Sequence, residues 1–291
     1  MKIKNIFAVL FFVVLTISFI FAKGNIKMNN KIQKNETRIP SVLPLFRGTL
    51  WWVGWDWSKE RLEKEIQAQC DIGFDLLWIF GTETLIEHAV KNDKNGKTND
   101  VLEIIYKIAD KKNMRVIIDL VPNGGGIFNK TTPEKAVAKA KIHINNIYNR
   151  YGSHKSFYGW YLNNELNPLH PSEKNVSLFW RKMWKGVVDE CHRTAPGSVV
   201  TISPFFLLDK ERFRGFIYLT PDEYAKWWET TLKETGIDIL MLQDSGEHLA
   251  FFTIKQREPF LKSVAKACHN AGAQFWVNVE TGEADVKKLI I

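Results

Sequence analysis

Short apolar segments alternate with amphipathic helical segments along most of this chain, and that alternation limits its possible folds more than any other feature. Several of the apolar segments are nearly continuous hydrophobic runs, which are typical of strands buried on both faces of a parallel sheet. No Gly-rich nucleotide-binding turn follows the first of them. The pattern therefore predicts an α/β fold, a (β/α)8 TIM barrel, rather than a doubly wound sheet. The expected strands lie within 48–57, 75–80, 114–126, 157–165, 198–206, 237–248 and 274–283.

The pattern stops before a regular eighth unit. After Glu283 only the sequence ADVKKLII remains, which can form a short helix or one strand but not both. We therefore expect a barrel that is truncated or irregular at its eighth unit, closed by a short improvised segment or left incomplete. A chain of 291 residues with 45% hydrophobic content can bury the core of a single barrel domain, which we place at 47–291.

The first residues have the pattern of a secretion signal. Lys2 and Lys4 precede an uncharged apolar run that ends in the small residue Ala22. This predicts a signal peptide over 1–22, and the polar segment 23–46 then resembles a linker to the domain. An uncleaved membrane anchor is the alternative, because the run is slightly long for a signal and slightly short for a full span. We expect an exported protein, periplasmic or extracellular, with no stable membrane insertion after cleavage.

The charge and the cysteines exclude several classes of function. The formal net charge falls from +8 to +6 when the two lysines of the signal are removed, and it is spread over helix faces. A solvated surface explains this spread better than affinity for an acidic polymer. The sequence has no recognised nucleic-acid module, and its three cysteines fall late in helical segments, as small buried hydrophobes do. We expect no metal, no cofactor and no nucleic-acid partner, and the oligomeric state stays open.

Two of the expected strands end in a glutamate. The segment FYGWYLNNELN begins at Phe157 as an aromatic strand and reaches Glu165, and the segment QFWVNVET reaches Glu280. Active sites of parallel barrels form at the carboxyl ends of the strands. The fourth and seventh strands lie nearly opposite each other in an eight-stranded barrel, so both carboxyl groups can point into one cleft. A helix cap or a salt bridge is the alternative role for Glu165.

Polar and aromatic residues near these two glutamates are candidates for binding a substrate. Asn164 can hold a sugar hydroxyl, and strand alternation places Trp276 and Asn278 on the same face as Glu280. The expected substrate-binding residues are Trp55, Asp56, Trp57, Tyr161, Asn164, Gln243, Asp244, Trp276 and Asn278.

The tryptophans of the first strand suggest a stacking wall, because Trp rings pack on the apolar faces of sugars. Trp55 and Trp57 lie nearest the carboxyl end of that strand, so we expect one of them to line the cleft. A plug at the end of the barrel is the alternative for this cluster, and Asp56 can instead cap a helix. Asp119 lies within its strand and is expected to be a buried structural acid. No role is assigned to Glu83.

Four segments of the chain resemble a known family. FYGWYLNNELN, TISPFF, DILMLQDSGEH and FWVNVETGE, in this order and spacing, are similar to the DUF4434 family of bacterial TIM barrels of unknown function. The resemblance runs from about Gly48 to Glu283 and implies a barrel related to glycoside hydrolases, without a known substrate. Asn164-Glu165 and Glu280 also resemble the retaining glycosidase clan, which implies that Glu165 is the acid/base and Glu280 the nucleophile. The final strand of that clan, which carries an aromatic sugar platform, has no counterpart here.

Together these observations predict an exported glycoside hydrolase that acts on an oligo- or polysaccharide with retention. One carboxylic acid protonates the leaving oxygen, and a second carboxylate attacks the anomeric carbon. The carboxyl groups of Glu165 and Glu280 should then lie roughly 5–5.5 Å apart, whereas about 6.5–9.5 Å indicates inversion. A non-catalytic carbohydrate-binding barrel and an inactive truncated product are the alternatives.

Overall fold

The structure is a computed structural model in which the described part of the chain forms a closed barrel. It describes residues 12–16, 46–94, 99–120, 130–166, 168–208, 210, 217–244 and 252–280, with the backbone alone for 12–16 and residue 280. The strands are β1 (Phe12–Thr16), β2 (Phe46–Trp52), β3 (Leu76–Phe80), β4 (Arg115–Leu120), β5 (Phe157–Leu162), β6 (Val199–Ile202), β7 (Ile239–Gln243) and β8 (Gln274–Glu280). The helices are α1 (Lys59–Asp71), α2 (Thr82–Lys94), α3 (Val101–Lys112), α4 (Pro133–Tyr151), α5 (Lys174–Thr194), α6 (Pro221–Thr235) and α7 (Ile254–Ala271).

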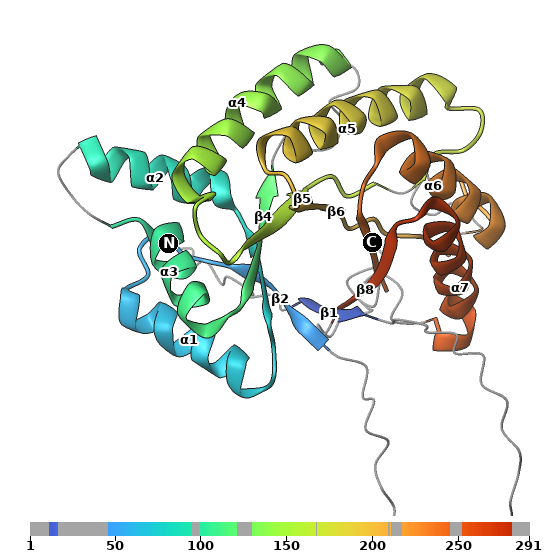
Figure 1. The fold of residues 1–291 in the computed structure, drawn as a ribbon. Helices are drawn as coiled ribbons and strands as arrows, with labels where there is room; N and C mark the ends of the chain where they lie inside the picture. The colour runs from blue at the N-terminus through green and yellow to red at the C-terminus, as the bar shows by residue number, and fades with distance from the viewer. Residues whose placement is uncertain are drawn as a thin grey trace, which may run out of the picture.

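Strands β2 to β8 pair in parallel in the order of the sequence, and helices surround them (Figure 1). The place of the eighth parallel strand is taken by β1, which pairs antiparallel with both β2 and β8. The prediction of a TIM barrel with an irregular eighth unit is therefore confirmed. β1 lies inside the segment assigned to a secretion signal, and that assignment stays a prediction. Among the described residues, no helix is both long enough and apolar enough to span a membrane.

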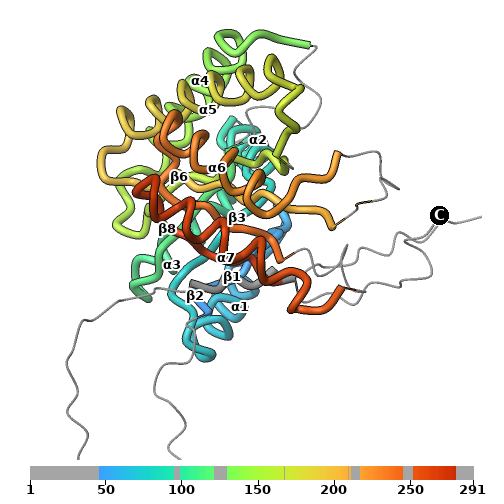
Figure 2. Tube along the Cα trace, turned by 90° about the vertical axis from the view of Figure 1, so that its right-hand side faces the viewer, coloured from blue at the N-terminus to red at the C-terminus, as the bar shows by residue number. Residues whose placement is uncertain are grey.

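Helix boundaries follow local capping chemistry. The hydroxyls of Ser58 and Thr132 accept hydrogen bonds from backbone N–H groups at the starts of α1 and α4. Thr220 and Glu223 form a reciprocal capping box at the start of α6. This helix ends at Gly236, whose left-handed φ of 74° stops it without the strain that a side chain brings. Helices α6 and α7 then lie side by side in both views (Figures 1 and 2).

Strand alternation divides the core into two layers. Inside the barrel, one cluster is formed by residues such as Leu50, Trp78, Tyr161, Met241 and Trp276. The larger layer lies between the outer faces of the strands and the helices. Burial of both faces explains why the strands are almost continuously apolar in sequence. The three cysteines are unpaired; two of them are buried and the third is partly buried, in keeping with their predicted role as hydrophobes.

His154 joins α3 to the turn before β5 through two carboxylates. Its Nδ1 lies 2.7 Å from Asp110 Oδ2, and its Nε2 lies 3.1 Å from Glu103 Oε2. Burial works against the charged imidazolium, but the hydrogen bonds to both carboxylates outweigh it, so the pKa of His154 is raised above its usual value. The same contacts lower the pKa values of Glu103 and Asp110 in spite of burial. The cluster therefore stabilises the fold while His154 is protonated.

We expect the His154→Gln variant to be destabilised by about 1 kcal/mol near pH 6. Because the folded-state pKa of His154 is raised, its stabilising effect is complete below the unfolded value of about 6.5 and is lost as the pH rises through the folded value. Urea denaturation between about pH 5 and pH 9 should show the wild type and the variant converging at high pH. A difference that stays constant with pH would contradict the assignment.

Candidate active site

Glu165 lies three residues beyond the end of β5, at the carboxyl end of the barrel. The backbone before it is anchored, because the N–H of Asn163 donates to the carbonyl of Leu120 at 3.2 Å. Asn164 is buried, and its Oδ1 accepts a hydrogen bond of 3.0 Å from the indole of Trp184 on α5. Glu165 itself is exposed. A fixed backbone thus presents an accessible carboxylate at the barrel mouth.

Gln243, at the end of β7, connects Glu165 to the barrel wall. Its Nε2 donates to the carbonyl of Ser203 at 3.0 Å and lies 3.4 Å from Glu165 Oε1. The side chain of Gln243 is buried, so the amide has a fixed position. The structure therefore brings together two of the predicted site residues that are far apart in sequence. The hydrogen bond to Oε1 leaves Oε2 of Glu165 available to another partner.

β8 brings further predicted residues to the same part of the barrel. Asn278 pairs in register with Gln243, and its Nδ2 lies 3.2 Å from the hydroxyl of Ser203. Trp276 is buried in the interior cluster, two residues before Asn278 on the same strand face. Among the described residues, Oδ1 of Asn278 has no hydrogen-bond partner although it is buried. Asn278 therefore offers an acceptor on the inner side of the barrel.

Glu280 is the last residue of β8, two positions after Asn278. Its backbone pairs with Phe12 of β1. The side chain of Glu280 lies outside the described residues. The separation of its carboxyl group from that of Glu165 stays a prediction.

Ser203 is a site residue that the sequence reasoning missed. It follows β6 directly, and its hydroxyl donates to the carbonyl of Met241 at 2.9 Å while facing the amide of Asn278. With its carbonyl bound to Gln243, Ser203 joins β6, β7 and β8 at their carboxyl ends. A polar residue between the apolar strand and Pro204 was the available signal in the sequence.

The first strand shows which of its tryptophans reach the mouth. Trp51 is buried in the outer layer, and Trp57 packs edge-on against it at 5.8 Å, with the guanidinium of Arg61 on its ring. Trp55 is 49% exposed and stacks on His88 at 4.2 Å. Trp52, two residues after the inward-facing Leu50, is 51% exposed. Trp52 is therefore a second exposed ring, and alternation places it on the inner side of the barrel.

Phe80 supports the exposed ring of Trp52. The two ring centroids lie 4.0 Å apart, and Phe80 packs against the interior cluster. Trp52 thus has an apolar support below it and an open face above. Asp56, in the turn that follows, is exposed.

Two other acidic residues near the strand ends have structural partners. Asp119 is fully buried and accepts from the backbone N–H groups of Gly81 and Thr82 at the start of α2, which confirms its predicted structural role. Burial is the largest influence on Asp119 and raises its pKa, against the lowering effect of these donors. Asp244 forms an ion pair of 3.3 Å with Arg257 on α7. Both carboxylates therefore serve to join secondary-structure elements.

Tyr161 lies inside the barrel below these groups. Its ring meets Trp78 edge-on, with centroids 4.7 Å apart. Burial raises the pKa of its phenol well above the usual value, and the charges of Glu165 and Asp119 raise it further. Tyr161 is therefore neutral at any physiological pH. Within the part of the chain that is described, no group of three or more side chains could hold a metal ion.

Comparison with protein families identifies the chain. The model of "Domain of unknown function (DUF4434)" matches residues 49–289. The chain belongs to the DUF4434 family. The family that four sequence segments indicated is thereby confirmed, and the match covers the whole described barrel except β1 and the start of β2. No curated protein matches this DUF4434 chain.

Solved structures similar to this DUF4434 protein include glycosidases. A candidate alpha-L-fucosidase from Bacteroides thetaiotaomicron is 16% identical with a TM-score of 0.56, over 84% of this chain and 78% of its own. An intracellular xylanase from Thermoanaerobacterium saccharolyticum, in complex with xylotriose, is 12% identical with a TM-score of 0.45, over 77% and 70%. A glycoside hydrolase family 5 protein from Bacteroides vulgatus is 12% identical with a TM-score of 0.44, over 76% and 46%. The first of these three supports the TIM-barrel fold.

We expect Asp119→Ala to destabilise the DUF4434 barrel by about 2–4 kcal/mol, because it leaves the N–H groups of Gly81 and Thr82 buried without an acceptor. Denaturant unfolding measures the loss. The exposed Asp56→Ala variant is the matched control and should stay within about 0.5 kcal/mol of the wild type. Equal small effects for both variants would show that Asp119 does not hold the start of α2.

Proposed function

We propose that this protein is a glycoside hydrolase that cleaves an O-glycosyl bond of an oligo- or polysaccharide with retention of configuration. Glu165 is the acid/base and Glu280 the nucleophile. The observation that carries the proposal is the position of Glu165, an exposed carboxylate held by Gln243 on the side of the barrel where β8 places Asn278. The backbone of Glu280 continues that strand.

The proposed reaction has two steps with different demands on the two glutamates. In the first, Glu165 gives a proton to the glycosidic oxygen while the carboxylate of Glu280 attacks the anomeric carbon and the leaving group departs. In the second, Glu165 takes a proton from a water molecule, whose oxygen replaces Glu280 on the sugar. The bond from Gln243 to one oxygen of Glu165 supports this role, because it leaves the other oxygen to carry the proton.

The TIM-barrel fold is compatible with this class of reaction, whereas the family, whose function is unknown, names neither a reaction nor a substrate. A solved structure that supports the fold, at a TM-score of 0.56, is a candidate alpha-L-fucosidase. At 16% identity, that similarity shows fold alone, so fucosides belong in a substrate panel beside glucosides, galactosides and xylosides.

We also propose that the protein is exported through a signal over 1–22, and the mass of the mature protein tests this.

We expect Glu165→Gln and Glu280→Gln each to lower kcat/KM by a factor of about 10³ or more on unactivated substrates, a loss in the range of removing a general acid or a nucleophile. Aryl glycosides distinguish the roles: with a good leaving group, Glu165→Gln should lose far less than Glu280→Gln. The exposed Glu87→Gln variant is the control and should retain wild-type rates. Proton NMR of the first product formed reports retention or inversion.

Wild-type protein that binds oligosaccharides without turnover would contradict the proposed enzyme. If binding then survived both glutamine substitutions, the barrel would be a carbohydrate-binding module. If Glu165→Gln lost rate by the same factor on substrates with good and with poor leaving groups, the role of Glu165 as the acid would be contradicted. The role of Glu280 would not be affected by that result.

The aromatic residues of the first strand give a separate test. We expect Trp52→Ala to weaken substrate binding by about 1–3 kcal/mol and leave the unfolding temperature nearly unchanged, because half of the ring is exposed. Trp57→Ala should instead cost about 2–4 kcal/mol of stability, since this ring packs against Trp51 and Arg61. The prediction that Trp55 lines the cleft is tested by Trp55→Ala in the same assays. If Trp52→Ala lost as much stability as Trp57→Ala, the ring of Trp52 would be core rather than a sugar platform.

A further inference from the structure

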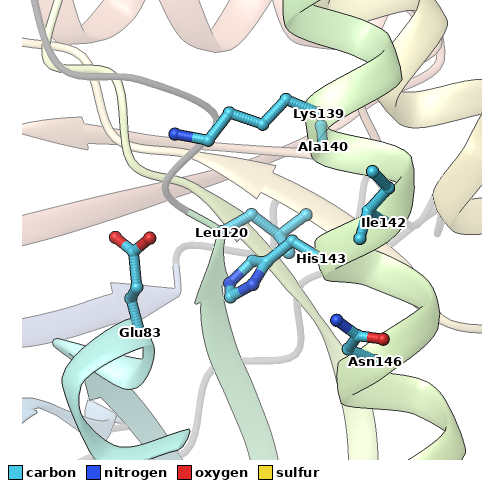
Figure 3. A pocket seen from close by; sticks show the side chains of 7 residues that line it. All are labelled: Glu83, Leu120, Lys139, Ala140, Ile142, His143 and Asn146. Atoms are coloured by element: carbon cyan, nitrogen blue, oxygen red, sulfur yellow. The ribbon is translucent and has the colours of Figure 1, made fainter. Parts of the chain in front are cut away.

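A small pocket lies outside the barrel wall, between α2 and α4 (Figure 3). One side is a face of α4 that carries Lys139, His143 and Asn146, and the other is Glu83 in the first turn of α2. Leu120, whose side chain belongs to the outer layer of the core, forms its floor. The pocket is therefore separated from the barrel mouth by the thickness of the strand β4.

Three polar groups of this pocket lack partners within the described structure. The Nε2 of His143 is buried and makes no hydrogen bond to any described residue. Neither Lys139 nor Glu83 forms an ion pair within the described ranges, whereas Lys141, on the same helix, pairs with Glu190. A buried nitrogen without a partner costs about 1–3 kcal/mol, so the Nε2 of His143 calls for a partner, whereas Lys139 and Glu83 are exposed and free to contact a ligand.

The arrangement of these groups defines what could bind. Figure 3 shows the ammonium of Lys139 reaching across the pocket above the His143 ring, with the carboxylate of Glu83 on the opposite side. Burial lowers the pKa of His143, although the facing charges of Glu83 and Asp119 oppose this, so the imidazole is neutral at neutral pH. The pocket thus presents one positive donor, one negative acceptor, one neutral imidazole and the amide of Asn146, with no excess of either charge. A ligand that matches it must carry several donors and acceptors and little net charge.

The size and the floor of the pocket restrict the ligand further. The volume is about 180 Å³, below the roughly 300 Å³ at which pockets for drug-sized ligands begin. The lining includes the buried Ala140 and the exposed Ile142 in addition to the buried Leu120, so apolar side chains line the pocket beside its polar groups. A single sugar ring fits this combination, because its C–H face is apolar and its hydroxyls both donate and accept.

We propose that this pocket is a binding site for one neutral monosaccharide unit, separate from the barrel mouth. Lys139 donates to a hydroxyl oxygen, Glu83 accepts from a hydroxyl, and the Nε2 of His143 gains the partner that it lacks. The site goes beyond the proposed hydrolase activity and does not depend on it. It would hold a sugar whether or not the mouth performs catalysis.

The test is to follow the imidazole Cε1–H signal of His143 by NMR in the full chain. The signal is assigned by its loss in His143→Gln. Titration with D-glucose, D-galactose, D-xylose and L-fucose should shift it with a Kd in the millimolar range for at least one sugar. Lys139→Met and Glu83→Gln should each raise that Kd about tenfold, and Lys135→Met, an exposed lysine on the same helix outside the pocket, should leave it unchanged.

Other outcomes would overturn the proposal. The proposal fails if no sugar shifts the Cε1–H signal of His143, or if neither Lys139→Met nor Glu83→Gln changes the Kd. It also fails if acetate or glycine shifts the signal and the sugars do not. Lys139 and Glu83 are exposed, so both variants are expected to fold, and unfolding temperatures check this. The Glu165→Gln variant should give the wild-type shift at His143. That result separates a failure at this pocket from a failure of the proposed catalytic site.

Discussion

Burial of both faces of each parallel strand is the constraint on which the rest of the structure depends. Alternate residues enter either the interior cluster, as Leu50 and Tyr161 do, or the layer beneath the helices. An inward-facing side chain can reach solvent only at the end of a strand, where the interior packing stops. Trp52 is half exposed for this reason, although the four residues before it in β2 are buried. The same constraint places the polar ends of β5, β7 and β8 around one opening.

Much of this arrangement could be predicted from the sequence, because burial on two sides leaves a continuous apolar run and capping residues mark the helix ends. Strand alternation then gives the face on which each side chain lies, and it correctly placed Trp276 and Asn278 on one face of their strand. The position of Ser203 before Pro204 marks a polar strand end in the sequence, but its bonds to β7 and β8 depend on the contact of three strands that are distant in sequence. Strand β1 was not predictable, because a signal peptide and a buried strand share the same apolar composition. The packing of Trp57 on Arg61 is likewise set by a turn and not by strand alternation.

Three acidic residues near the strand ends differ in their surroundings. Asp119 is enclosed and bound by backbone N–H groups, and Asp244 is paired with an arginine of a covering helix. Glu165 faces solvent beside a neutral amide. A carboxylate that already satisfies a helix start or a guanidinium has little freedom to exchange protons with a ligand. The position of Asp119 within its strand sets it apart in the sequence, whereas the difference between Glu165 and Asp244 comes from tertiary contacts, which no local pattern encodes.

The antiparallel strand β1 has a consequence for the end of β8. The parallel pairing of β8 with β7 ends at Asn278, which lies opposite Gln243. The last two residues of β8, Val279 and Glu280, pair with β1. Val13 lies opposite Val279, and Phe12 lies opposite Glu280. One side of this tip is thus tethered by a five-residue segment that is remote in sequence from the rest of the barrel. Cleavage of the proposed signal over 1–22 would remove this tether, so the uncleaved and the mature chain would differ first at the backbone of Glu280.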